Sequence, residues 1–260
     1  MDDAAASGEF ELIENLPFTT DRGVGARARI GVVVLASDYT IEHEFRQVLD
    51  QPDVALFVAR IKNSPQITPE TLAAMGPLLT ETAERILPGD SVDVLAYGCT
   101  SASTVLGTDK VDAFLRAAKP MARPTNPIAS AFAAFEAFGA RRIAVLTPYR
   151  RDVNAVVRET FEAAGYRIPV FGSFNEENDP VVAAIDAESL KAAVRAITTG
   201  RDVDAVFVSC TSIRLLDAVA EIEAETGLPV TSSNHAMAWR CLRLAGIEDK
   251  RPEFGRLYSL

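Results

Sequence analysis

Residues 92–101 read VDVLAYGCTS, and residues 203–212 read VDAVFVSCTS. The two stretches align without a gap at an offset of 111 residues, five of their ten positions are identical, and the middle of each stretch stays apolar in both copies. An internal repeat constrains the architecture more than any local pattern does. Two copies at this spacing predict a pair of lobes related by a pseudo-twofold axis, because a solenoid needs more repeats of a shorter unit.

Two weaker similarities occur in the same order and support the duplication. RIGVV at residues 29–33 corresponds to RIAVL at residues 142–146, and Thr125-Asn126 corresponds to Ser233-Asn234, each pair directly before a predicted helix. We therefore expect the last helix to return to the first lobe. The predicted organisation is an N-terminal arm at 1–27, a first lobe formed by 28–125 plus 233–260, and a second lobe at 126–232.

Short apolar runs alternate with longer helical patterns through both lobes. Continuously apolar runs rich in β-branched residues are typical of parallel strands buried on both faces. The alternation predicts an α/β fold in which each lobe is an open parallel sheet flanked by helices. The expected strands are 30–36, 54–59, 92–97, 142–147, 168–172, 205–209 and 228–231. The expected helices are 41–49, 69–86, 111–118, 128–138, 153–164, 190–197, 213–226 and 236–245.

The composition argues against several classes of protein. Among 260 residues, 36 acidic and 26 basic side chains give a net charge of −10, so we expect no nucleic-acid or membrane partner. The acidic first residues lack the apolar segment of a signal peptide, which predicts a cytoplasmic protein with three free cysteines. We expect no metal, because no Cys/His cluster has ligand spacing. The sequence also lacks a dinucleotide fingerprint.

Cys99 and Cys210 are the candidate catalytic residues. Each follows a predicted strand in a Cys-Thr-Ser tripeptide, and ligands bind at that end of the strands in open α/β sheets. We expect a helix to begin after each tripeptide, where its dipole and N–H groups would lower the cysteine pKa and bind a carboxylate. Two opposed thiols suit proton transfer by two bases or one nucleophile with one acid. The alternative is that each cysteine is a small apolar residue buried in the core without a catalytic role, which is the prediction for Cys241.

The paired tripeptides, the stretch LASDYTIE at 35–42, Thr147-Pro148-Tyr149 and Ser232-Ser233-Asn234 resemble the Asp/Glu racemase superfamily. The resemblance covers about residues 28–250 and favours the branch of maleate cis–trans isomerase, arylmalonate decarboxylase and ectoine-utilisation protein A. It implies an enzyme without a cofactor, with the active site between the two lobes. In maleate isomerases the first-lobe cysteine forms a succinyl adduct, and that position matches Cys99. The second cysteine, matching Cys210, acts as acid or base. Arylmalonate decarboxylases have only the second-lobe cysteine. The presence of both cysteines in this sequence therefore favours isomerisation or racemisation over decarboxylation.

The resemblance also implies substrate-binding residues. Tyr149 matches a tyrosine that holds a substrate carboxylate, and Asn178 matches an asparagine, although Asn175 or Asp179 could take its place. Asp38 stands where maleate isomerases have asparagine. Since a carboxylate repels a dicarboxylate, we interpret Asp38 as binding a positively charged or hydrogen-bond-donating group, which favours the ectoine branch; the alternative is a helix cap. We also expect the hydroxyl and N–H groups of the two tripeptides to bind a carboxylate of the substrate or to cap helices. These groups belong to Thr100, Ser101, Thr211 and Ser212.

The sequence therefore predicts a cofactor-independent isomerase or racemase of a small carboxylate, either an ectoine-derived amino acid or a maleate-like acid. Three alternatives remain. The first is a true maleate isomerase that uses a succinyl-cysteine adduct, and the second is a hydrolase or lyase with one catalytic thiol. The third is a two-lobed binding protein without turnover, which would need neither thiol. The resemblance further implies a homo-oligomer.

Overall fold

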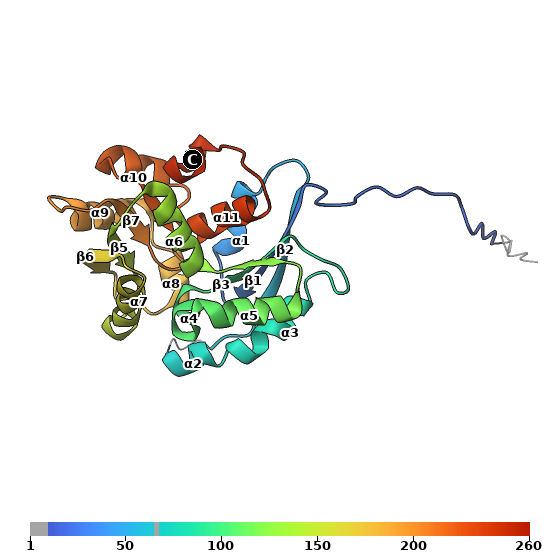
Figure 1. Cartoon of the computed structure of the whole chain (residues 1–260), viewed down its shortest axis with the longest axis horizontal. Coiled ribbons are helices and arrows are strands. Elements are labelled where there is room, and N and C mark those ends of the chain that lie inside the picture. The colour runs from blue at the N-terminus through green and yellow to red at the C-terminus, as the bar shows by residue number, and fades with distance from the viewer. Residues whose placement is uncertain (1–9, 65–67) are drawn as a thin grey trace, which may run out of the picture.

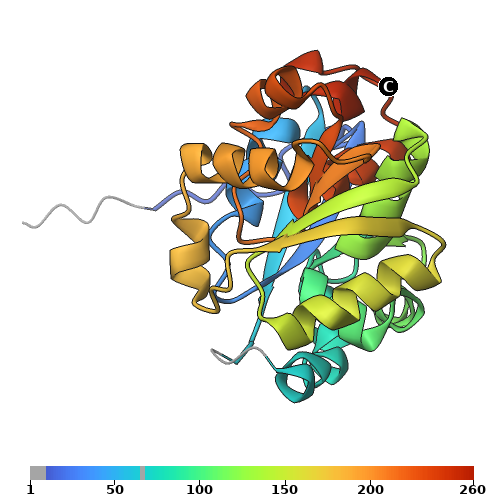
Figure 2. The same ribbon diagram turned by 90° about the vertical axis from the view of Figure 1, so that its left-hand side faces the viewer.

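Two four-stranded sheets, each entirely parallel, form the centres of two lobes in the computed structural model, which describes residues 10–64 and 68–260 (Figures 1 and 2). The strand orders are β2-β1-β3-β4 and β6-β5-β7-β8. The same order in both sheets agrees with the internal repeat, and the predicted fold class is confirmed. The strands are β1 (Ala28–Leu35), β2 (Val54–Ile61), β3 (Val94–Gly98), β4 (Arg123–Thr125), β5 (Arg142–Thr147), β6 (Arg167–Ser173), β7 (Ala205–Val208) and β8 (Val230–Ser232).

Helices flank both sheets. Those that pack in the first lobe are α1 (Ile41–Val48), α2 (Pro69–Ala73), α3 (Gly76–Glu84), α4 (Thr100–Leu106), α5 (Thr108–Ala118) and α11 (Ser233–Leu244). Those of the second lobe are α6 (Pro127–Phe138), α7 (Arg151–Ala163), α8 (Asp179–Ala183), α9 (Ala187–Thr198) and α10 (Val219–Thr226). The chain ends in two short 3₁₀ helices, η1 (Pro252–Phe254) and η2 (Arg256–Ser259).

Burial on both faces explains the continuously apolar strands. In β1, Ile30 and Val32 belong to one buried cluster, whereas Val33 between them belongs to a second cluster on the opposite face. Successive side chains of a strand point to opposite faces, so a strand covered on both sides is apolar at every position. Met237 of α11 lies in the same cluster as Ile30, so the C-terminal helix packs against the first sheet. Helix α6 packs against α11 where the lobes meet (Figure 1).

The structure corrects four details of the predicted elements. The helix expected at 69–86 is two helices, because Pro77 lies in the first turn of α3, where a missing N–H is tolerated and a new helix can start. The helix expected at 213–226 begins only at Val219. Strand β4 has three residues, one of them a proline, and α8 has five, so neither is long enough to show a periodic pattern.

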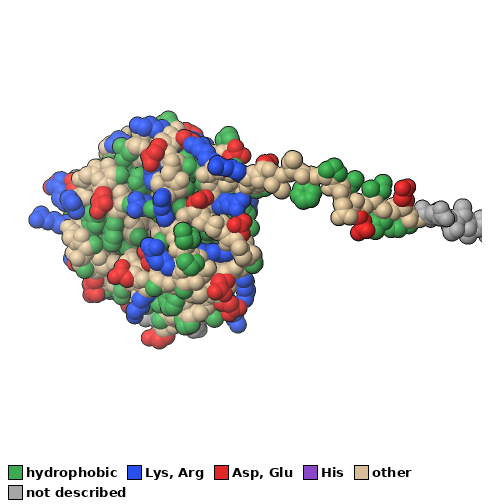
Figure 3. All heavy atoms as spheres, turned by 45° about the vertical axis from the view of Figure 1, so that its right-hand side comes forward, with side chains coloured by type: hydrophobic (Ala, Val, Ile, Leu, Met, Phe, Trp, Pro, Cys, Tyr) green, Lys and Arg blue, Asp and Glu red, His purple; other side chains and the backbone are tan. Residues whose placement is uncertain are grey.

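The described part of the N-terminal arm, which begins at residue 10, extends away from the two lobes (Figure 1). Residues 10–27 form no helix or strand, and large apolar side chains along them are exposed, among them Phe10 and Phe18 at 85% each (Figure 3). Residues 1–9 of the predicted arm, with the acidic Asp2, Asp3 and Glu9, lie outside the described residues. Within the described ranges, no helix is long and apolar enough to cross a membrane.

Candidate active site

A small cavity lies between the lobes at the carboxyl ends of the strands. Its volume is about 30 Å³, which is room for roughly one or two water molecules. From the first lobe, the residues that line it are Leu35, Asn63, Ser64, Thr71, Leu72, Met75, Cys99, Thr100 and Ser101. From the second lobe they are Tyr149, Asp179, Cys210, Thr211 and Ser212. Seven of the nine predicted site residues therefore meet in one cavity, and Asp38 and Asn178 do not line it.

Cys99 is the N-cap residue of α4, at the end of β3. Only 3% of its surface is exposed, and its Sγ lies 3.7 Å from Oγ of Ser101. Burial raises the pKa of the Cys99 thiol to about 11, although a hydrogen bond from the amide of Ala102 opposes this rise. The thiol lies at a helix start, as predicted, but with a pKa of about 11 it is protonated at neutral pH.

Cys210 has a different local setting. No helix follows it directly, and its tripeptide forms a turn in which the amide N–H of Ser212 donates to Cys210 Sγ at 3.4 Å. Burial and the charge of Asp179 raise the pKa of the Cys210 thiol to about 12. The prediction of a helix after Cys210 is therefore wrong.

The predicted lowering of both cysteine pKa values is also wrong. A few N–H groups stabilise a thiolate, but removing the thiolate from water costs more free energy in a closed cavity. The desolvation of both sulfur atoms, which the sequence alone does not display, determines the direction of the shift.

Ser233 holds the two cysteine loops together from the start of α11. Its Oγ accepts a hydrogen bond from Thr100 Oγ1 at 2.8 Å and another from the backbone amide of Cys210 at 3.1 Å. Thr100 follows Cys99 directly, so one hydroxyl links the first-lobe loop to the second-lobe loop. The hydroxyl of Thr100, predicted to bind substrate, is used in this contact.

Two buried tyrosines accompany the thiols. The pKa of Tyr149 is raised well above its usual value by burial and by its contact with Cys210, and that of Tyr97 is raised by burial and by its contact with Cys99. Tyr149 lines the cavity, as predicted, and at neutral pH its protonated hydroxyl can donate to a substrate oxygen. Tyr97 donates to Met75 Sδ at 3.6 Å and was not predicted as part of the site.

Asp179, and not its neighbour Asn178, contributes to the cavity. The side chain of Asn178 caps α8 by accepting from the amide of Val181 at 3.3 Å. Asp179 is the next residue and faces the interior, where it accepts from Oγ of Ser212 at 3.3 Å and from Oγ of Ser37 at 3.5 Å. The segment after β6 therefore brings a carboxylate, instead of the expected amide, to the two thiols.

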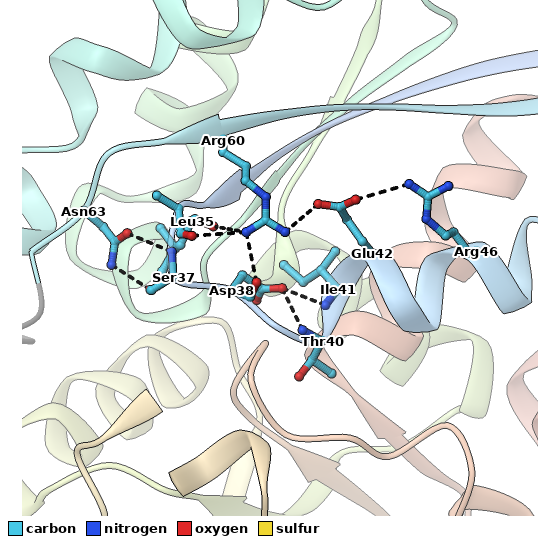
Figure 4. A network of polar contacts seen from close by, with 10 residues as sticks. Leu35, Ser37, Asp38, Thr40, Ile41, Glu42, Arg46, Arg60 and Asn63 are labelled. Atoms are coloured by element: carbon cyan, nitrogen blue, oxygen red, sulfur yellow. Dashed lines mark hydrogen bonds and ion pairs between the residues drawn. The ribbon is translucent and has the colours of Figure 1, made fainter. Parts of the chain in front are cut away.

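Asp38 accepts hydrogen bonds at the start of α1, where Thr40 is the N-cap residue. Its Oδ1 accepts from the amides of Thr40 at 2.9 Å and Ile41 at 2.8 Å, as Figure 4 shows. Arg60 donates to the backbone oxygen of Asp38 at 3.0 Å. Burial raises the pKa of Asp38 to about 6. These contacts are those of the alternative interpretation, in which Asp38 acts as a helix cap.

Replacing Asp38 by asparagine is expected to leave substrate preference unchanged within about twofold, because an amide oxygen can cap the same two N–H groups. Asp38→Ala removes the cap and is expected to lower the free energy of unfolding by about 1 kcal/mol. Urea denaturation and kcat/KM for two competing substrates measure the two effects. A reversal of preference in Asp38→Asn would return Asp38 to the binding site.

Glu44 is a buried carboxylate that the sequence analysis did not identify. Its Oε1 accepts from the amides of Leu215 and Leu216, each at 2.8 Å, and its Oε2 accepts from Nδ2 of Asn234 at 2.9 Å. Asn234 also donates to the backbone oxygen of Thr211 at 2.8 Å. Glu44 thus fixes the loop after Cys210 from the first lobe. Helical periodicity could have identified this residue, because it places Glu44 beside Ile41 and Phe45 on the buried face of α1.

Other candidate chemistry lies outside the cavity. His235 is buried between Oγ1 of Thr231 and the backbone oxygen of Phe254, where burial lowers its pKa to about 4, so it anchors the C-terminal segment. Cys241 is fully buried in the first-lobe core. In the part of the chain that the structure describes, no group of three or more His, Cys, Asp or Glu residues could hold a metal ion.

Comparison with known proteins places this site in a family. The family model described as arylmalonate decarboxylase matches residues 55–258. The maleate isomerase of Pseudomonas putida is 29% identical over 247 residues, which are 89% of this chain and 97% of that protein. The arylmalonate decarboxylase of Bordetella bronchiseptica is 35% identical over 130 residues, covering 47% of this chain and 52% of that protein.

Solved structures agree with the sequence comparisons. The Nocardia farcinica maleate cis–trans isomerase bound to TRIS superimposes with a TM-score of 0.82 at 28% identity, covering 89% of this chain and 98% of that one. A cysteine-to-serine mutant of that enzyme, with a covalently bound succinylcysteine intermediate, gives a TM-score of 0.81 at 26% identity over the same shares. This chain therefore belongs to the arylmalonate decarboxylase family, in the branch of the Asp/Glu racemase superfamily that contains the maleate isomerases, and it is an isomerase of that superfamily.

Proposed function

We propose that this protein isomerises a small carboxylate without a cofactor, with Cys99 as nucleophile or base and Cys210 as acid or base. The observation that carries the proposal is that both Cys-Thr-Ser cysteines, one from each lobe, line the same cavity. Binding alone needs no thiol, and a decarboxylase with one catalytic cysteine does not need the second. The first candidate substrate is an amino acid derived from ectoine, and the second is maleate.

In the first scheme the substrate changes configuration at its α-carbon. The thiolate of Cys99 removes the α-proton, and the electron pair of the C–H bond passes into the carboxylate to give an enediolate. The thiol of Cys210 then donates its proton to the opposite face of the carbon and becomes the thiolate. The reverse reaction starts from Cys210, so each cysteine serves as base in one direction and as acid in the other. Tyr149, in contact with Cys210, is positioned to donate to the developing negative charge.

The second scheme is cis–trans isomerisation, which the likeness to the maleate isomerases favours. The thiolate of Cys99 adds to one carbon of the double bond, and the displaced electron pair moves to the neighbouring carbon, which Cys210 protonates. Rotation about the resulting single bond, return of the proton and expulsion of the Cys99 thiolate give the trans acid. The succinylcysteine in the mutant Nocardia enzyme is an adduct of this type.

Proton NMR in D₂O separates the two schemes. Samples contain maleate, aspartate, glutamate, ectoine or its ring-opened acetyl-diaminobutyrates, with wild-type protein beside Cys99→Ser and Cys210→Ser. Deuterium at an α-carbon, lost in both variants, supports proton transfer between two thiols. Fumarate formed from maleate, lost in Cys99→Ser, supports the adduct. Binding of a ligand without conversion or exchange, unchanged in both variants, would contradict the proposed function and support a binding protein.

A further inference from the structure

The cavity contains one carboxylate without a positive partner. Among its described lining residues there is no lysine, arginine or histidine, and Asp179 is the single acidic side chain. Within residues 10–64 and 68–260, the contacts of the Asp179 carboxylate are the hydroxyls of Ser37 and Ser212, at 3.5 and 3.3 Å. A carboxylate has about four acceptor positions, and both of these hydrogen bonds are long. Asp179 therefore retains the capacity to accept strong hydrogen bonds from a ligand.

The surrounding groups are oriented as donors toward this carboxylate. Asn63 donates from Nδ2 to Oγ of Ser37 at 2.9 Å, which leaves the Ser37 hydroxyl hydrogen available to Asp179. Ser37 follows β1 of the first lobe and Ser212 follows β7 of the second, so Asp179 is held from both walls. Two hydroxyl donors on one carboxylate suit its ionised form. The arrangement places an ionisable carboxylate inside the cavity, where the two hydroxyls favour its charged form and burial raises its pKa.

We propose that Asp179 selects the substrate by receiving the ammonium group of a small amino acid, so that the cavity accepts zwitterionic carboxylates and disfavours dicarboxylates without an ammonium group. This inference rests on the proposed function and names the class of substrate. Charge complementarity is its physical basis: inside a poorly solvated cavity, an ammonium group pairs with Asp179, whereas a second carboxylate is repelled by it. The carboxylate of the substrate faces the hydroxyl groups of Ser101 and Thr211, which line the same cavity.

The same pairing has a consequence for the two thiols. The negative charge of Asp179 is one of the causes that raise the pKa of Cys99 and of Cys210. A substrate ammonium beside Asp179 offsets this charge and makes either thiolate easier to form. Binding of an amino acid would thus favour the thiolate form of the cysteines, and binding of a dicarboxylate would disfavour it.

Calorimetric titration with ligands that differ by one ammonium group tests the selection. Wild type, Asp179→Asn and Asp186→Asn are titrated with racemic 2-aminobutyrate, butyrate and maleate. Asp186 is the matched control, because it caps the start of α9 outside the cavity and asparagine can cap equally well. We expect wild type and Asp186→Asn to bind 2-aminobutyrate at least about tenfold more tightly than butyrate. In Asp179→Asn this preference is expected to disappear, and binding of maleate to strengthen.

A second readout needs no ligand. Alkylation by iodoacetamide at pH 8, followed by peptide mass spectrometry, measures the thiolate fraction of each cysteine. Asp179→Asn is expected to speed alkylation of Cys99 and Cys210 several-fold, with the fully buried Cys241 as internal control. An unchanged ligand preference in Asp179→Asn, the lack of any preference in wild type, or unchanged alkylation would each overturn the inference.

The outcomes separate this inference from the proposed function. Loss of isotope exchange in Cys99→Ser and Cys210→Ser, with an unaltered preference in Asp179→Asn, would retain the two-thiol isomerase and reject Asp179 as its selecting residue. Altered preference in Asp179→Asn, with conversion intact in both cysteine variants, would retain the ammonium site and reject the two-thiol mechanism.

Discussion

Cys99→Ser and Cys210→Ser are each expected to reduce kcat by at least about 10³-fold. A serine hydroxyl is a far weaker acid than a thiol, so neither proton transfer nor attack on carbon proceeds at a useful rate when oxygen replaces sulfur. The two losses should not add in the double variant, because the residues act on one reaction coordinate as a pair. Initial rates with the substrate identified by NMR measure all three effects.

The controls for this result use the third cysteine and ligand binding. Cys241 is fully buried in the first-lobe core and does not line the cavity, so Cys241→Ala is expected to keep kcat within about twofold while lowering stability. Both active-site variants should still bind substrate, since a hydroxyl fits where a thiol was. Full activity in either Cys99→Ser or Cys210→Ser would contradict the two-thiol mechanism.

Glu44→Ala is expected to lower the free energy of unfolding by about 3–5 kcal/mol near pH 5. The change leaves three buried N–H groups without an acceptor, the amides of Leu215 and Leu216 and one of the two N–H groups of the Asn234 side chain, at about 1–3 kcal/mol each before relaxation. Because those groups hold the loop after Cys210, kcat should also fall by at least about tenfold. Urea denaturation and initial rates measure the two effects.

The stability difference between wild type and Glu44→Ala should depend on pH. Burial raises the pKa of Glu44 from 4.5 to about 7, so the folded state binds a proton that the unfolded state releases between these values. The contribution of Glu44 is therefore fully present below about pH 4.5 and declines as the pH rises to about 7, by as much as about 3 kcal/mol. The difference between the two proteins should narrow over this range and stay constant above it.

Glu42→Ala provides the matched control on the same helix. Glu42 forms ion pairs with Arg46 and Arg60 at the surface, and such pairs contribute about 0–1 kcal/mol. Its removal should cost little stability and no activity. Equal effects of the Glu42 and Glu44 substitutions, or a stability difference for Glu44→Ala that does not change between pH 5 and pH 8, would contradict the role of Glu44.

Much of the fold was predictable because it depends on local pattern. The apolar runs predicted seven of the eight strands, and the internal repeat predicted a pair of similar lobes, although not the strand order of their sheets. Two predictions failed for physical reasons. Strand β4 was missed because three residues are too few to show a pattern. The helix expected at 213–226 starts late because residues 213–218 form turns, in which the amides of Leu215 and Leu216 donate to Glu44 of the other lobe. A tertiary partner replaced the helical hydrogen bonds that the local sequence favours.

The sequence by itself determined the α/β class, the two-lobed duplication and the convergence of Cys99 and Cys210. Each cysteine follows an equivalent strand, and a pseudo-twofold axis brings the carboxyl ends of the two sheets to one cleft. Only the tertiary structure decided which carboxylate serves which purpose. Asp38 caps a helix, Asp179 enters the cavity and Glu44 joins the lobes. It also decided that both thiol pKa values rise. These properties depend on burial and on partners distant in sequence, and both are set only when the two lobes pack together.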